Sequence, residues 1–227
     1  MSNSKNNFQK GFRKKFIKVK TAKKRKISST KWLQRQLNDE YTILAKENNY
    51  RSRAAFKLLE IDNNFNLLKD ANYLLDLGAA PGSWLQVAAK NKNIKNIIGV
   101  DINDIEPIDN VDIIKGDFLD LETKSKLSDI LNGKKPDLIL SDIAPYTSGH
   151  KNTDHIRLIN ILEDILLFIE ENMEKNGNFV AKLFLGAEIE SLKDRFKKKF
   201  NKVKFIKPKA SRKDSVEQYM VCLGFID

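Results

Sequence analysis

The sequence predicts an α/β fold in which one mostly parallel sheet is covered by helices on both faces. Three observations predict it. Strand-like and helix-like segments alternate along the 227 residues, and alternation of this kind is typical of parallel strands with helices between them. A hydrophobic strand runs directly into a turn of small residues, DLGAAPGSW, at positions 76–84. The chain is also 41% hydrophobic, which is enough for one sizeable core.

Seven short β-branched or apolar runs are predicted to be strands, and several of them follow Gly, Asn or Pro. They are residues 73–77, 97–101, 112–114, 137–141, 178–184, 202–206 and 218–225. Helical patterns are found at about 51–66, 83–91, 122–132, 154–174 and 188–200. Ahead of them, a short helix is expected within 31–50, docking onto the domain. In sheets of this kind a ligand binds beyond the carboxyl ends of the strands.

Residues 1–30 are predicted to be a basic, disordered tail ahead of a single domain at 31–227. Residues 1–26 hold eleven Lys or Arg and no acid, whereas the rest of the chain is balanced in charge. A block of like charge stays extended until it meets a polyanion, and RNA is the expected partner. A second basic cluster, 193–213, has eleven Lys or Arg against one acid. Two clusters favour nucleic-acid binding over the alternatives for the tail, a solubilising segment or a transit peptide.

Several classes of protein are not supported by the sequence. There is no apolar run long enough for a membrane span and no signal peptide pattern. The single cysteine, Cys222, lies in the apolar run YMVCLGF and is expected to be buried. His150 and His155 have no partners at metal-ligand spacing, so no metal site is expected. These features fit a reduced, cytoplasmic protein, with a monomer as the default state.

The glycine turn narrows the class of ligand. A phosphate loop needs GxxxxGK[ST], and no lysine follows Gly82 here. A dinucleotide fold needs three glycines as GxGxxG, whereas this turn has two glycines and Pro81. An adenosine-like ligand that lies against the backbone remains. Asp101, at the end of the next strand, is placed to accept hydrogen bonds from ribose hydroxyls, and Asp117 is placed to accept one from an adenine amino group.

Four motifs give the chain a resemblance to a known family. With DLGAAPGSW, SDIAPYTSG, VAKLF and SVEQY, the chain resembles the FtsJ/RlmE family of bacterial 23S ribosomal RNA methyltransferases, over about residues 32–227. The resemblance implies a Rossmann-like S-adenosylmethionine-dependent methyltransferase, with a seven-stranded sheet whose last strand is antiparallel. It implies S-adenosyl-L-methionine as the cofactor. It also implies transfer of a methyl group to the ribose 2′-hydroxyl of a uridine in the 23S rRNA of the large ribosomal subunit.

The resemblance also implies two sets of site residues. The catalytic set is carried over to Lys57, Asp142, Lys182 and Glu217, and the cofactor-binding set to Gly82, Trp84, Asp101, Asp117 and Asp142. Two positions depart from the family pattern. Ser83 stands where the family usually has a second glycine, and Tyr146 stands where asparagine is commoner.

Methyl transfer to a ribose hydroxyl needs in-line placement and loss of the hydroxyl proton. A free lysine is almost fully protonated at neutral pH. Burial and the charge of Lys57 would favour a neutral Lys182, whereas Asp142 and Glu217 would favour a charged one. The hypothesis is that Lys182 accepts the proton or stabilises the developing alkoxide. Lys57 and Glu217 would position it and the ribose, and Asp142 would hold the lysine and the cofactor's amine together.

RNA is expected to contact the tail, the 193–213 cluster, Arg51 and Arg53, and Tyr146 is placed to stack on a base. Other functions stay open. A tRNA or mRNA ribose methyltransferase would use the same four catalytic residues. An RNA-binding assembly factor would keep the fold without the reaction. An oxidoreductase would bind a nicotinamide dinucleotide instead of S-adenosylmethionine.

Overall fold

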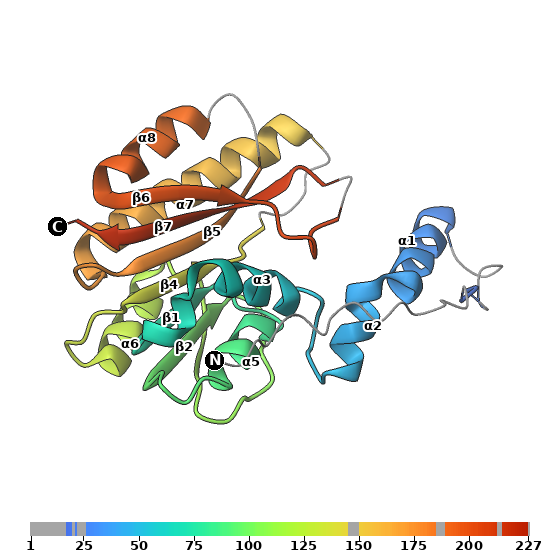
Figure 1. Cartoon of the computed structure of the whole chain (residues 1–227), viewed down its shortest axis with the longest axis horizontal. Helices are drawn as coiled ribbons and strands as arrows, with labels where there is room; N and C mark the ends of the chain where they lie inside the picture. Colours follow the sequence, from blue (N-terminus) through green and yellow to red (C-terminus); the bar gives the residue numbers. More distant parts are fainter. Residues whose placement is uncertain are drawn as a thin grey trace, which may run out of the picture. The chain divides into compact units, whose positions relative to one another are not determined.

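The structure, a computed structural model, describes residues 17–19, 21, 26–144, 150–184, 189–212 and 215–226. The chain divides into two compact units, Met1–Leu44 and Ala45–Asp227. The larger unit contains a seven-stranded sheet with helices (Figure 1). No helix within the described ranges is long and apolar enough to cross a membrane.

The sheet has the order β3-β2-β1-β4-β5-β7-β6. Its strands are β1 (Tyr73–Leu77), β2 (Asn96–Asp101), β3 (Asp112–Lys115), β4 (Leu138–Ser141), β5 (Asn178–Phe184), β6 (Phe200–Ile206) and β7 (Glu217–Phe225). The pairs among β1 to β5 are parallel, and β7 is antiparallel to both β5 and β6. All seven predicted strands are therefore present, each end within two residues of its prediction, and the antiparallel last strand is confirmed.

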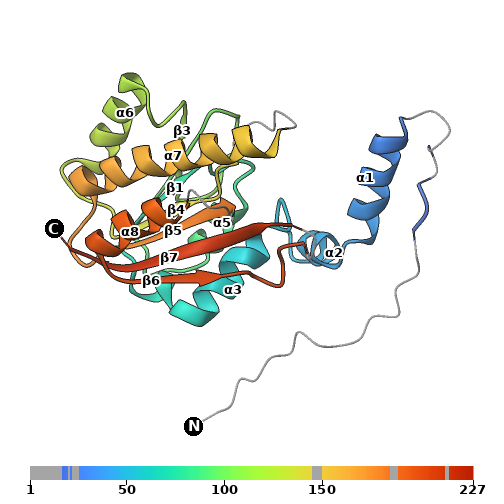
Figure 2. The ribbon, with the colours of Figure 1, turned by 90° about the horizontal axis from the view of Figure 1, so that it is seen from above.

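Helices cover both faces of this sheet. On one face lie α3 (Ala55–Phe65), α4 (Leu67–Asp70) and α5 (Ser83–Ala89), and on the other lie α6 (Leu121–Leu131), α7 (Lys151–Asn172) and α8 (Ile189–Lys199). Figure 2 shows α3 on one side of the sheet and α6 and α7 on the other. Successive strand side chains point to opposite faces. Leu74 therefore packs with α3 to α5, while Leu75 and Leu77 pack with α6 to α8.

The predicted helix at about 51–66 begins four residues later, at Ala55. The four preceding residues form a bend and a turn instead, and two of them contact α5. The amide of Arg51 donates to Oε1 of Gln86 (2.8 Å), and Oγ of Ser52 lies 2.7 Å from Oγ of Ser83. The other four predicted helices of the larger unit agree with the structure within three residues at each end. Cys222 is buried, as predicted.

Two helices replace the single short helix predicted within 31–50. They are α1 (Ile27–Asn38) and α2 (Glu40–Glu47), and α2 continues into the larger unit. They are separate because Asp39 has an extended backbone, and its Oδ1 accepts the amide of Thr42 (2.9 Å) in the first turn of α2. Residues 1–16, 20 and 22–25 lie outside the described ranges. The disordered tail, its boundary at residue 30 and the docking of the helix stay predictions.

Candidate active site

The glycine turn brings the ends of three parallel strands together. Gly78, just after β1, has a φ of +74°, and a Cβ atom there would lie 2.3 Å from Cγ1 of Ile143. Only glycine combines this backbone conformation with so close an approach. The amide of Gly78 also donates to the carbonyl oxygen of Val100 (2.8 Å). Asp101, which follows Val100, and Asp142, which precedes Ile143, are therefore held at the same edge of the sheet.

A cavity of about 460 Å³ lies at this edge. Its size is within the range of small-molecule binding sites. Three of the predicted cofactor-binding residues line it, Asp101, Asp117 and Asp142, and Ile102 and Phe118 add apolar surface. The prediction that a ligand site lies beyond the carboxyl ends of the strands thus agrees with the position of this cavity.

Two of these carboxylates are fixed by hydrogen bonds from loops, and Asp101 joins its own loop to the glycine turn. Oδ2 of Asp101 accepts the amide of Ala80 (2.9 Å), and Oδ1 accepts the amide (2.8 Å) and the side-chain Nδ2 (3.0 Å) of Asn103. Oδ1 of Asp117 accepts the amide of Leu119 (3.0 Å). An ionised carboxylate has about four lone-pair sites. Both side chains are therefore oriented and still able to accept hydrogen bonds from a ligand.

Gly82 and Trp84 lie close to the turn, but neither lines the cavity. Gly82 has a φ of +99° at the start of α5, and a Cβ atom there would lie 2.5 Å from Nη1 of Arg51. Trp84 is 3% exposed, and its Nε1 donates to the carbonyl oxygen of Ala54 (2.8 Å). Its ring centroid is 5.8 Å from that of Tyr219. Both residues shape the turn and the core beneath it, and their contact with a cofactor stays a prediction.

The serine that departs from the family pattern fits without strain. Ser83 is the first residue of α5, and the positive φ falls on Gly82 before it. Ser83 is buried, and its hydroxyl forms the contact with Ser52 described above. A second glycine is therefore not required at this position.

All four predicted catalytic residues meet. Lys57 comes from α3, Asp142 follows β4, Lys182 lies in β5 and Glu217 begins β7. Nζ of Lys182 is 3.2 Å from Oδ1 of Asp142 and donates to its carbonyl oxygen (2.6 Å). Nζ of Lys57 is 2.9 Å from Oε1 of Glu217 and 3.8 Å from Oδ2 of Asp142. Their side chains are between 7% and 20% exposed. A buried set of opposite charges results.

Tyr219 joins this set, although it was not among the predicted site residues. Its hydroxyl donates to Oδ1 of Asp142 (2.6 Å) and accepts from Nζ of Lys57 (2.9 Å). It pairs with Lys182 between β5 and β7 and is fully buried. The available signal was its position two residues after Glu217, because alternate residues of a strand share one face. We refer to Tyr219 and the four predicted residues together as the Asp142 cluster.

Ser211 supports the cluster from the segment between β6 and β7. Its Oγ donates to Oε1 of Glu217 (2.7 Å), the same oxygen that contacts Lys57. Ser211 is buried, and the neighbouring carbonyl of Ala210 accepts a hydrogen bond from Nη2 of Arg53. A serine in a basic segment gives no recognisable pattern, so sequence reasoning did not find it.

The charges of the cluster set the protonation of two of its members. Burial alone would raise the pKa of Asp142, but the charges of Lys182 and Lys57 and the hydroxyl of Tyr219 outweigh it and hold that pKa below its ordinary value. Burial, and then the charges of Asp142 and Glu217, raise the pKa of Tyr219 well above its ordinary value. Asp142 is therefore an anion at neutral pH, and Tyr219 is a neutral donor.

Asp76, the first residue of DLGAAPGSW, lies behind the turn in β1. It is 1% exposed, and neither carboxyl oxygen has a hydrogen-bond partner in the described part of the chain. Burial, and then the charges of Asp142 and Asp101, raise the pKa of Asp76 well above its ordinary value. It is a buried acid that favours its protonated form.

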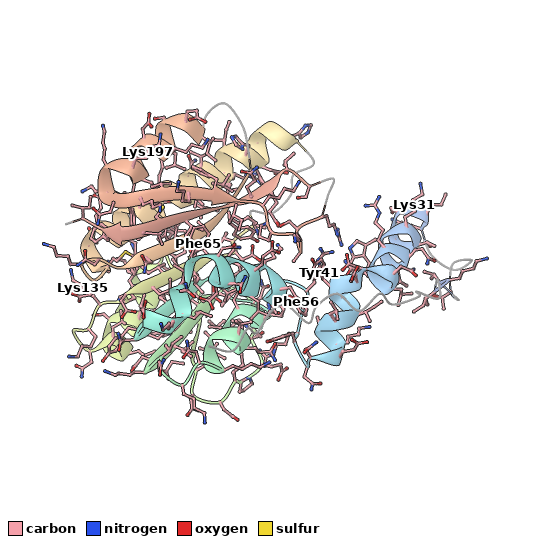
Figure 3. The ribbon with its side chains drawn as sticks, viewed as in Figure 1. Lys31, Tyr41, Phe56, Phe65, Lys135 and Lys197 are labelled. Carbon is pink, nitrogen blue, oxygen red and sulfur yellow. The ribbon has the colours of Figure 1, made fainter. Side chains whose placement is uncertain are left out.

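Of the residues predicted to contact RNA, some are exposed and others are bonded within the protein. Arg51 donates to the carbonyl oxygens of Pro81 (2.9 Å) and Pro107 (3.0 Å), so it holds loops of the turn. The 193–213 cluster includes Lys197, on the exposed surface of α8 (Figure 3). Tyr146 lies outside the described residues. No group of His, Cys, Asp or Glu that could hold a metal ion is found among those that are described.

Comparisons with known proteins identify the family of this chain. A family profile described as FtsJ-like methyltransferase matches residues 50–225. A relative from Cereibacter sphaeroides, named ribosomal RNA large subunit methyltransferase E, is 44% identical over 231 residues, covering 98% of this chain and 94% of the relative. A relative of the same name from Novosphingobium aromaticivorans is 48% identical over 208 residues, covering 92% and 93%.

A solved structure from Plasmodium falciparum, described as a ribosomal RNA methyltransferase, has a TM-score of 0.70 and 39% sequence identity. The similarity covers 78% of this chain and 98% of that one. The family match spans most of the chain and includes every residue of both predicted site sets. The chain belongs to the FtsJ-like methyltransferase family.

Proposed function

We propose that this chain transfers a methyl group from S-adenosyl-L-methionine to the ribose 2′-hydroxyl of a uridine in the 23S rRNA of the large ribosomal subunit. One observation carries the proposal. Asp142 lines the cavity and also contacts both Lys182 and Lys57. A single carboxylate therefore joins a cavity suited to the cofactor to a pair of lysines suited to a hydroxyl group. The names of the relatives support ribosomal RNA as the substrate.

The residues around the cavity fit S-adenosylmethionine. When bound, the cofactor supplies a methyl group on a positively charged sulfur, and it also carries an ammonium group. Three carboxylates line the cavity and match this charge, Asp101, Asp117 and Asp142. Asp101 would accept hydrogen bonds from the ribose hydroxyls, Asp117 from the adenine amino group, and Asp142 from the ammonium group. Ile102 and Phe118 would pack against the adenine ring.

Lys182 would act on the hydroxyl of the RNA. Its Nζ is held by two oxygens of Asp142, which fix its position before any substrate binds. From there it would accept the hydroxyl proton or stabilise the negative charge that develops on the oxygen. Lys57, held by Glu217 and Tyr219, would place a second positive group beside the same oxygen. The Asp142 cluster would thus be arranged for charge stabilisation in advance.

The RNA would be held by electrostatic contacts outside the cluster. Exposed lysines of α8 and β6, including Lys197, Lys202 and Lys204, form part of the 193–213 cluster. Lysine contacts with phosphates give affinity that falls with salt and carries little sequence information. We expect a monomer that acts in the cytoplasm, where its ribosomal substrate would be found.

The test is transfer of labelled methyl from S-adenosylmethionine to large ribosomal subunits from cells that lack the enzyme. Wild type and Lys182→Ala are compared, with free rRNA and tRNA as alternative acceptors. We expect label at a ribose of a uridine in the subunit RNA, and a loss in kcat of about 10²–10⁴-fold in Lys182→Ala. Titration with the cofactor should show that the variant still binds it.

Lys115→Ala is the matched control, because it removes an exposed lysine at the end of β3, away from the cluster. It should transfer methyl groups at the wild-type rate. Label in tRNA and not in ribosomal RNA would show that the proposed substrate is wrong. A protein that binds the cofactor and labels no acceptor would support the assembly-factor alternative, and one that binds only a nicotinamide dinucleotide would support the oxidoreductase.

A further inference from the structure

One face of α1 carries an exposed aromatic ring beside two basic side chains. Trp32 is 58% exposed. Ser28, Lys31 and Arg35 are also exposed, and they stand four residues before, one before and three after Trp32. This spacing places the four side chains on a single face of a helix. Lys31 is labelled on α1 in Figure 3.

The opposite face of α1 makes contacts within the protein. Leu33 and Leu37 are half-buried. Oδ1 of Asn38 accepts the amide of Ile17 (2.9 Å), and Oε1 of Gln34 accepts the amide of Val19 (3.0 Å). The helix therefore turns its leucines and its amide side chains away from solvent. Trp32 therefore lies on a different face of α1 from the side chains that make these contacts.

We propose that the Lys31–Trp32–Arg35 face binds a single-stranded segment of the RNA substrate. An unpaired base would stack on the indole of Trp32, and neighbouring phosphates would contact Lys31 and Arg35. This inference rests on the proposed function, because it assigns part of the recognition of that RNA to α1. It deepens that function by naming an unpaired, stackable nucleotide as what this face recognises.

Charge complementarity identifies RNA as the occupant. The α1 sequence, ISSTKWLQRQLN, contains no acid. The residues before it, 1–26, hold eleven Lys or Arg and also no acid. A face of this kind attracts a polyanion and repels basic surfaces. The planar indole adds a contact that any base can satisfy, because every base has a π-face.

The same face fits an anionic membrane less well. A helix that lies on a membrane buries a continuous apolar stripe in the lipid. On α1 the two leucines, Leu33 and Leu37, lie on the half-buried face, and the exposed face has one ring beside two cations. A single ring beside two cations matches stacking on one base better than insertion into lipid.

The experiment uses the full-length protein and a uridine-rich, single-stranded RNA of about twelve nucleotides, a length within the usual footprint of such sites. The chain has two tryptophans, and Trp84 is buried. Quenching of tryptophan emission by the RNA therefore reports on Trp32. We expect Trp32→Ala to weaken RNA binding by about 5- to 100-fold, and Trp32→Phe to retain most of the affinity because it keeps a stacking ring.

Two further variants separate stacking from charge and from general loss of apolar surface. The double substitution Lys31→Gln and Arg35→Gln should reduce the slope of log Kd against log salt by about 1.4, the value for two phosphate contacts on a single strand. Leu121→Ala removes an apolar side chain on α6 that is 84% exposed and should leave RNA affinity unchanged. Circular dichroism of each variant checks that it is folded.

The outcomes distinguish this inference from the proposed function. If wild type methylates ribosomal RNA while Trp32→Ala binds the oligonucleotide and the substrate with unchanged Kd and KM, the inference is wrong and the function stands. If the RNA quenches Trp32 and no acceptor is methylated, the inference holds and the function is wrong. A shift of Trp32 emission with anionic lipid vesicles, together with no quenching by RNA, would also overturn the inference.

Discussion

The Asp142 cluster and the cavity beside it hold their charged groups in place in different ways. Within the cluster, each charged group contacts others of the cluster, and most side chains are deeply buried. Along the cavity, Asp101 and Asp117 are held instead mainly by backbone amides, from Ala80 and Asn103 for Asp101 and from Leu119 for Asp117. A change in the cluster should therefore disturb several charged groups at once, whereas a change at Asp101 or Asp117 should leave those charged groups in place.

The physical reason is the cost of burying charge. A buried charge is tolerated only when it is paired and hydrogen-bonded, and removal of one partner leaves the other uncompensated. Lys182 is 7% exposed and Lys57 12% exposed, so each depends on its carboxylate. A carboxylate that faces a cavity and accepts hydrogen bonds from backbone amides does not depend on a charged partner.

Asp142 belongs to both regions, and its substitution should have the largest effect. Asp142→Asn keeps the shape of the side chain and removes the charge that faces Lys182 and Lys57. We expect kcat/KM for RNA to fall by about 10³-fold, with weaker cofactor binding as well. Single-turnover methyl transfer and calorimetric titration with S-adenosylmethionine measure the two effects. Normal cofactor affinity in this variant would place Asp142 in the cluster alone.

Asp101 tests the cavity alone. Asp101→Asn removes the charge of an acceptor that would face the ribose of the cofactor, and each hydrogen bond to a charged group contributes about 1.5–3 kcal/mol. We expect the Kd for S-adenosylmethionine to rise by about 10- to 100-fold, while kcat at saturating cofactor stays near that of wild type. Asp129→Asn, at an exposed position of α6, is the control. If Asp101→Asn lost as much kcat as Asp142→Asn, the two regions would not be distinct.

Tyr219 tests the cluster alone. Tyr219→Phe keeps the ring that packs against Trp84 and removes the hydroxyl between Asp142 and Lys57. We expect kcat to fall by about 10-fold, because two hydrogen bonds in a charged network are lost, with an unchanged Kd for the cofactor. Rapid-quench kinetics and the cofactor titration are the measurements. A raised Kd with normal kcat would show that the hydroxyl serves the cavity instead.

Asp76 should give the smallest effect, on stability. Its pKa is raised in the folded state, so above the ordinary carboxyl pKa of about 3.9 the folded protein keeps a proton that the unfolded chain has released. The contribution of Asp76 to the free energy of unfolding therefore falls as pH rises from the ordinary carboxyl pKa to the raised pKa of the folded state. Asp76→Asn should therefore raise Tm at pH 7, by about 2–4 °C per kcal/mol recovered, and change it little at pH 4. Thermal unfolding at both pH values, beside Asp129→Asn, is the measurement, and an equal shift at both would contradict this account.

Local patterns were sufficient for the seven strands of the sheet. The runs that became β1 and β5 are short and apolar, and a run of that kind is buried wherever the chain places it. The turn at Gly78 could be predicted from the sequence because its backbone conformation requires glycine. The four predicted catalytic residues could be named because the resemblance to the family assigns them to short segments of the sequence. In all these cases the information lies within a few neighbouring residues.

Contacts between distant segments depended on the tertiary structure. The hydroxyl of Tyr219 reaches Asp142 and Lys57 because β7 inserts beside β5 and α3 packs over that face, an arrangement that no local pattern encodes. The contacts of Arg51 and Ser52 with α5, just ahead of α3, join residues more than thirty positions apart. Burial of Trp84 away from the cavity and the bond from Ser211 to Glu217 have the same origin. Hydrophobic periodicity reports which face of an element is buried, but the partner atoms of a polar side chain are set only when the sheet order brings remote segments together.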